Sequence, residues 1–123
     1  MKVLDASAVL AKLRRETGHE NIEFAGSILS LVNFAEVATV LVRDGHEVDE
    51  LAQDLVSLGV ELRPLTPVVA LLAGELYAVT KTRGLSLGDR ACLALARTLD
   101  VPAVTAESAW DGLEHGARVG RVR

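Results

Sequence analysis

The sequence predicts an α/β fold of three layers, in which helices cover both faces of a central parallel sheet of four to five strands. Short apolar runs alternate along the chain with longer segments of helical periodicity, an order typical of parallel sheets. Half of the residues are hydrophobic and only 3% are aromatic, so the core must be built from Ala, Val and Leu. Because the 123 residues contain no repeat or linker, we expect residues 1–123 to form a single domain.

The first half of the chain contains two predicted strands, each followed by helical sequence. The first strand ends at Asp5, and the second leads into a long helix that Gly45 stops. A further helix carries leucines at helical spacing and ends at Gly59. The expected ranges are 2–4 and 28–31 for the strands and 7–15, 32–43 and 49–58 for the helices.

The second half repeats this alternation. Pro64 suits the end of a strand, and Thr66 followed by Pro67 is typical of a helix start. That helix is expected to stop at Gly84, and Gly120 weakens the last apolar segment as a strand. The expected strands are 60–65 and 103–105, with a fifth within 117–122, and the expected helices run from 67 to about 82 and over 89–99.

Charge and composition exclude several classes of protein. The formal net charge of −4 is the opposite of what a protein that binds nucleic acid by overall charge requires, so such a role needs local basic patches. The single cysteine, Cys92, excludes an intrachain disulfide and a thiolate metal site, and we expect it to pack in the core. No apolar run approaches the roughly 20 residues of a membrane span, and no leader is evident. We therefore expect a soluble, cytoplasmic protein that does not bind membranes.

Several acidic residues follow strand ends or open helices at one edge of the predicted sheet, where parallel sheets place their functional crevice. Each also has an ordinary structural explanation. Asp5 and Asp89 suit helix N-caps, and Glu36 lies on one helical face with Asn33 and Arg43, where it would be solvated. Both interpretations stay open for each residue. Carboxylates gathered at one edge would repel one another unless a cation lay among them, and an oxygen-only ligand set suits Mg²⁺ or Mn²⁺.

Four motifs give the chain a specific resemblance. In their order along the chain they resemble the PIN-domain ribonucleases, and most of all the VapC-type toxins of bacterial type II toxin–antitoxin systems. The segment RRETGHE at 14–20 is similar to the end of that family's first helix. The motifs are VLDAS at 3–7, SLVNFAEV at 30–37, LSLGDRACLALA at 85–96 and VTAESAW at 104–110.

The resemblance implies a PIN-like fold and assigns a role to each matching residue. Asp5, Glu36 and Asp89 correspond to the metal-binding acids. Ser7 and Thr105 correspond to polar side chains that orient these acids or a bound water. Glu107 stands where the family usually has Asp, so the resemblance includes it among the catalytic residues but leaves a second metal position in doubt.

The implied activity is RNA phosphodiester hydrolysis with Mg²⁺, or Mn²⁺ as a substitute. A metal held by carboxylates supplies both an activated water and charge neutralisation, so no protein nucleophile is needed. The implied partners are a cognate antitoxin, an RNA substrate and a second copy in a homodimer. The spare apolar surface of the helices at 32–42 and 49–58 suits such partners. Arg83 and Arg90 flank the acidic residues in sequence, which suggests that they hold RNA phosphates.

Two other functions compete with the nuclease. Glu107 motivates a PIN-like fold that has lost activity and serves as a binding module. A phospho-receiver domain has similar length and alternation but fits less well. A receiver domain needs paired acids after the first strand, an Asp after a middle strand and a Lys after a late one. Here Asp5 stands alone after the first strand, Leu65 leads into Thr66, and no Lys follows Thr105.

Overall fold

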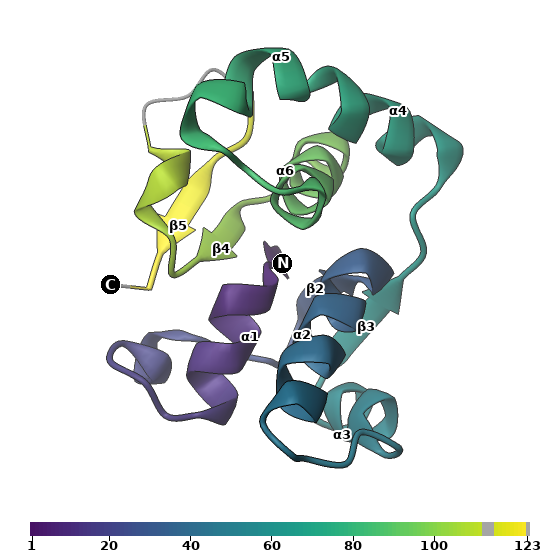
Figure 1. Ribbon diagram of the computed structural model, residues 1–123, viewed down its shortest axis with the longest axis vertical. Helices are drawn as coiled ribbons and strands as arrows, with labels where there is room; N and C mark the ends of the chain where they lie inside the picture. Colours follow the sequence, from purple (N-terminus) through teal and green to yellow (C-terminus); the bar gives the residue numbers. More distant parts are fainter. Residues whose placement is uncertain (112–114, 123) are drawn as a thin grey trace.

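Five parallel strands form the centre of the protein (Figure 1). The computed structural model describes residues 1–111 and 115–122. The strands are β1 (Lys2–Leu4), β2 (Ser27–Ser30), β3 (Val60–Arg63), β4 (Ala103–Thr105) and β5 (Val119–Arg121). Their order is β3-β2-β1-β4-β5, with every neighbouring pair parallel. This order differs from the 2-1-3-4-5 order of receiver domains, so the phospho-receiver interpretation is wrong.

Helices cover both faces of the sheet. One group consists of α1 (Ala6–Leu13), the short helix η1 (His19–Asn21), α2 (Leu31–Arg43) and α3 (Leu51–Ser57). The other consists of α4 (Pro67–Glu75), α5 (Tyr77–Thr80), η2 (Lys81–Arg83) and α6 (Leu87–Leu99). A last short helix, η3 (Ser108–Trp110), lies between β4 and β5 along the chain. Figure 1 shows the first group in its lower part and α4, α5 and α6 in its upper part.

Alternation of side chains along the strands creates two hydrophobic cores. Val3 and Ile28 point into the core beneath α4 and α6, where Cys92 is wholly buried. Leu4 and Leu29 point into the opposite core, beneath α1, α2 and α3. Successive residues of a strand face opposite sides, so each short apolar strand serves both cores. The three-layer architecture predicted from the alternation is confirmed.

The predicted helix over 67–82 is wrong in one respect, because it is divided into α4, α5 and η2. The Thr80 hydroxyl donates to the Leu76 carbonyl at 2.8 Å, and the Arg90 guanidinium donates to the Ala73 carbonyl at 3.0 Å. These side chains satisfy carbonyl groups around the break. Within the described residues, no helix has the length and apolar character needed to cross a membrane.

Candidate active site

β1 and β4 lie side by side in the sheet, and their carboxyl ends carry the first part of the site. From β1 the chain proceeds outward through β2 and β3, whereas β4 and β5 lie on its other side. The order therefore reverses at this pair, which is where open parallel sheets form their crevice. Asp5 follows β1 directly and Thr105 ends β4. The Thr105 hydroxyl donates to Asp5 Oδ2 at 2.6 Å, joining residues a hundred positions apart.

Asp5 is held by hydrogen bonds on both of its carboxylate oxygens. Its Oδ1 accepts the Ala8 backbone N–H at 2.8 Å, which makes Asp5 the N-cap of α1. The Ser7 hydroxyl lies 2.8 Å from Oδ1 and 2.9 Å from Oδ2, and it also accepts the Ala106 N–H at 3.0 Å. The structure therefore brings Asp5, Ser7 and Thr105 together. The side chain of Asp5 is only 2% exposed.

Burial dominates the electrostatics of Asp5. It raises the pKa of this carboxyl to about 6, against the hydrogen bonds from Thr105, Ala8 and Ser7, which lower it. The negative charge of Asp89 contributes to this raised pKa. A buried carboxylate that is costly to ionise marks a candidate functional group when it lies at a crevice.

Glu36 is not solvated on a polar helix stripe. Asn33, which would share that stripe, is completely buried, and Glu36 itself is half-buried. Asn33 Nδ2 donates to Glu36 Oε1 at 2.8 Å and to the Gly88 carbonyl at 3.0 Å. Burial raises the pKa of Glu36, the Asn33 bond lowers it, and the charge of Asp89 raises it. The solvated alternative fails because α6 packs over this part of α2.

Asp89 lies in the first turn of α6, but it is not the N-cap. Ser86 holds that position, and its hydroxyl accepts the Asp89 N–H at 3.1 Å. Asp89 Oδ2 accepts the Ser86 N–H at 2.9 Å in return, which completes a capping box. The expected cap was misplaced because Ser86, three residues earlier, accepts the Asp89 N–H and so starts the helix sooner. The helix consequently begins at Leu87, two residues before its predicted start.

The charges of Asp5, Glu36 and Asp89 act at one place. Burial raises the pKa of the Cys92 thiol well above its ordinary value, and all three carboxylates raise it further. Asp89 also raises the pKa of both other acids. The Asp89 carboxylate, at the start of α6, therefore repels both Asp5, after β1, and Glu36, on α2.

These residues suit a divalent cation by their negative charge and their oxygen donors. Within residues 1–111 and 115–122, no three His, Cys, Asp or Glu side chains lie close enough to form a metal site. Asp5 already accepts hydrogen bonds on both oxygens, whereas Glu36 Oε2 and Asp89 Oδ1 accept none from the described residues. Oxygen donors and mutual repulsion suit Mg²⁺ or Mn²⁺.

The remaining predicted residues differ in how they relate to this cluster. The Glu107 backbone N–H donates to the Thr105 hydroxyl at 2.9 Å, but its side chain is exposed. Asp111, the other acid after β4, pairs with Arg121 at 2.8 Å. Arg83 is exposed on η2. Arg90 is partly buried, where it donates to the Ala73 carbonyl, and its guanidinium lies 5.5 Å from the centre of the Tyr77 ring.

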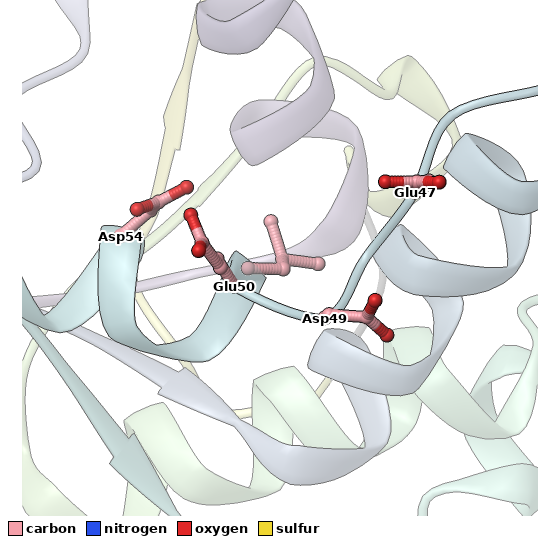
Figure 2. Close-up of a pocket in the computed structure, with 5 residues that line it drawn as sticks. Glu47, Asp49, Glu50 and Asp54 are labelled. Atoms are coloured by element: carbon pink, nitrogen blue, oxygen red, sulfur yellow. The ribbon is translucent and has the colours of Figure 1, made fainter.

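Two surface pockets lie elsewhere. An acidic pocket of about 370 Å³ is lined by Glu47, Asp49, Glu50, Leu51 and Asp54, and Figure 2 shows these carboxylates on α3 and the loop before it. A second pocket, of about 490 Å³, combines apolar and basic side chains. It is lined by Lys12, Leu13, Arg15, His19, Phe24 and Leu58. The sequence predicted neither pocket. The acidic side chains at 47–54 look like any solvated stretch, and the second pocket joins residues from Lys12 to Leu58.

The structure is an α/β fold with acidic residues at the point where the strand order reverses. Comparison with known proteins identifies the family to which this fold belongs. The family model of the PIN domain matches residues 2–115, and the chain belongs to the PIN domain family. Among curated protein sequences, none matches the chain significantly.

Solved structures show the same fold at low sequence identity. A toxin–antitoxin complex from Klebsiella pneumoniae superposes with a TM-score of 0.78 at 15% identity, covering 100% of this chain and 98% of that one. FitAcB from Neisseria gonorrhoeae gives 0.72 at 16% identity, covering 99% and 98%. VapC20 from Mycobacterium tuberculosis, a sarcin–ricin loop cleaving toxin, gives 0.71 at 17% identity, covering 96% and 99%.

Proposed function

We propose that this protein is a metal-dependent endoribonuclease and the toxin of a toxin–antitoxin pair. The observation that carries the proposal is the placement of Asp5, buried and bonded to Thr105, at the reversal point of a PIN-domain sheet, where Asp89 raises the pKa of both Asp5 and Glu36. The RNA-cleaving toxin with the same fold supports ribonuclease activity.

In this proposal Asp5, Glu36 and Asp89, which form no ready-made metal site in the described residues, would close on Mg²⁺, for which Mn²⁺ would substitute. Held by these carboxylates, Mg²⁺ would supply an activated water and neutralise charge on the phosphate that is cleaved. Ser7 and Thr105 fix the Asp5 carboxylate through their hydroxyls. Both bonds favour the ionised form of Asp5, against the burial that raises its pKa. Glu107 is a fourth catalytic acid, with its backbone anchored at Thr105.

Arg83 and Arg90 are proposed to neutralise RNA phosphates near the acids. Arg83 is exposed, so it suits a phosphate contact. Arg90 also serves the fold through its bond to Ala73. If both arginines bind phosphate, Arg83→Ala weakens RNA binding and lowers the slope of affinity against salt by about one charge. Unchanged affinity and salt slope in Arg83→Ala and in Arg90→Ala would rule out these contacts.

The proposed partners are an antitoxin and a second copy of the chain. The toxin–antitoxin complex from Klebsiella pneumoniae motivates the antitoxin. The pocket of Lys12, Leu13, Arg15, His19, Phe24 and Leu58 suits an antitoxin segment that presents apolar and acidic side chains. For the homodimer, Val68 and Leu71 of α4 are 70% and 68% exposed and offer apolar contact area. We place the pair in the cytoplasm.

The test is cleavage of a panel of structured RNAs by purified protein in Mg²⁺ or Mn²⁺. Discrete cuts are expected, and they should disappear in EDTA and in Asp89→Asn. Asp54→Asn, in the acidic pocket away from the site, is the matched control and should cleave normally. Cleavage that survives Asp89→Asn would contradict the assignment. If the protein binds its antitoxin but cuts no RNA, the inactive binding module is the better interpretation.

A further inference from the structure

We propose that Asn33 and Gly88 are positioning residues that hold the Glu36 carboxylate against the first turn of α6, beside Asp89. Neither residue bears a role in the function proposed above. The inference rests on that function only where it treats Glu36 as a metal ligand. The contacts themselves come from three elements: the end of β2, the first turns of α2 and the start of α6.

Asn33 uses every polar group of its side chain. Its Oδ1 accepts the Ser30 hydroxyl at 2.7 Å, and Ser30 also caps α2 by accepting the Asn33 N–H. Its Nδ2 donates to Glu36 Oε1 at 2.8 Å and to the Gly88 carbonyl at 3.0 Å. Asn33 is fully buried, so water cannot reach its amide, and these hydrogen bonds take the place of those it would make to water.

The direction of this amide is determined by its surroundings. A flipped amide would place Oδ1 against the Glu36 carboxylate and the Gly88 carbonyl, leaving three oxygens together without a hydrogen. Only the observed orientation donates to Glu36. The spacing of Ser30, Asn33 and Glu36, three residues apart each time, places all three on one side of the helix start.

Gly88 completes the arrangement by having no side chain. A Cβ at this position would lie 2.1 Å from Glu36 Oε1 and 2.3 Å from Glu36 Cδ. Gly88 lies inside α6, where Ala is the better helix former, and its backbone has no left-handed angle that would require glycine. The local reason for glycine is therefore the space that the Glu36 carboxylate occupies.

Two measurements test the inference, and the first is stability without metal. In EDTA, Gly88→Ala should change Tm less favourably than it does in the Glu36→Ala background, because the new methyl group must push the flexible end of Glu36 off its bond with Asn33. In the Glu36→Ala background the same substitution should leave Tm unchanged or raise it. Gly74→Ala is the matched control, since no described atom lies within 4 Å of a Cβ there, and it should not lower Tm in either background. Equal changes in Tm for Gly88→Ala in both backgrounds would overturn the inference.

The second measurement is the affinity for Mn²⁺, read by calorimetry. Asn33→Ala should weaken Mn²⁺ binding about tenfold or more, in the range typical of residues that orient a ligand. Adding it to Glu36→Ala should cause no further loss. Ser27→Ala is the control. Ser27 is as buried as Ser30 but lies at the opposite end of β2, so the loss of its hydroxyl should leave the affinity unchanged. Full Mn²⁺ affinity in a folded Asn33→Ala would overturn the positioning role of Asn33.

The two proposals fail in different ways. If the wild-type protein binds no Mn²⁺ and cleaves no RNA, the proposed function is wrong. The stability measurement still tests whether Gly88 makes room for the Glu36 carboxylate. If the wild type binds Mn²⁺ but Asn33 and Gly88 do not depend on Glu36, the inference alone is wrong.

Discussion

Replacing Asp5 with Asn should make the protein more stable at neutral pH while abolishing its activity. Burial raises the pKa of Asp5 from 3.8 to about 6. At about 1.36 kcal/mol for each pKa unit, ionising this residue costs the folded state about 3 kcal/mol. An amide carries no charge, but it accepts fewer of the hydroxyl and N–H donors, a loss of about 1 kcal/mol. We therefore expect Asp5→Asn to gain about 2 kcal/mol.

The pH dependence follows from the direction of the shift. The unfolded carboxyl loses its proton near 3.8 and the folded one near 6, so between these values the folded state binds more protons. Stability of the wild type falls as pH rises through this window, and the full cost is present above it. The advantage of Asp5→Asn should therefore be full at about pH 8 and absent at about pH 4.

Urea unfolding in EDTA, measured across this pH range for both proteins, tests the reasoning. EDTA removes divalent cations, which would offset the charge. Asp54→Asn, an exposed acid on α3, is the control and should change stability by less than about 0.5 kcal/mol. A variant less stable than wild type at about pH 8, or a difference that does not vary with pH, would refute the argument that burial of an ionised Asp5 is costly.

Three further predictions concern the fold and the homodimer. Arg90→Ala should lower the free energy of unfolding by about 1–3 kcal/mol, because it leaves the Ala73 carbonyl without that donor, as urea unfolding will show. Leu71→Glu should keep the monomer's stability within about 0.5 kcal/mol, since the side chain is exposed, but light scattering should show a dimer reduced to monomer. Gly18→Ala should lower Tm by about 5 °C or more, because a Cβ there lies 2.4 Å from the Val122 carbonyl oxygen and φ is +87°. A stable Arg90→Ala, a dimeric Leu71→Glu or an unchanged Tm for Gly18→Ala would each contradict its prediction.

Local sequence was sufficient to predict most of the secondary structure. The strands Lys2–Leu4 and Ala103–Thr105 match their predicted ranges, and the others lie within a few residues of theirs. Apolar runs, helical spacing and stop residues act within about ten positions, so a single sequence displays them. The single-domain extent of residues 1–123 stays a prediction.

The sequence also indicated the candidate acids, because Asp5, Asp89 and Glu107 follow a strand end or open a helix and the family resemblance added Glu36. It could not decide between their structural and functional interpretations. Asp5 is at once the N-cap of α1 and part of a buried network, so the alternatives are not exclusive. Asn33 was missed because its helical face is polar in sequence. A serine, an asparagine and a glutamate at successive three-residue intervals were the available signal.

By itself, then, the sequence determined the strands, the helices and the acids that terminate or open them. Tertiary structure decided which polar groups lie next to one another. It placed β4 beside β1, so that Thr105 meets Asp5, and packed α6 over α2, so that Asn33 is buried and Glu36 lies against Gly88. The physical reason is that periodicity is a property of neighbouring residues, whereas the solvation of a polar side chain depends on segments far along the chain that cover it.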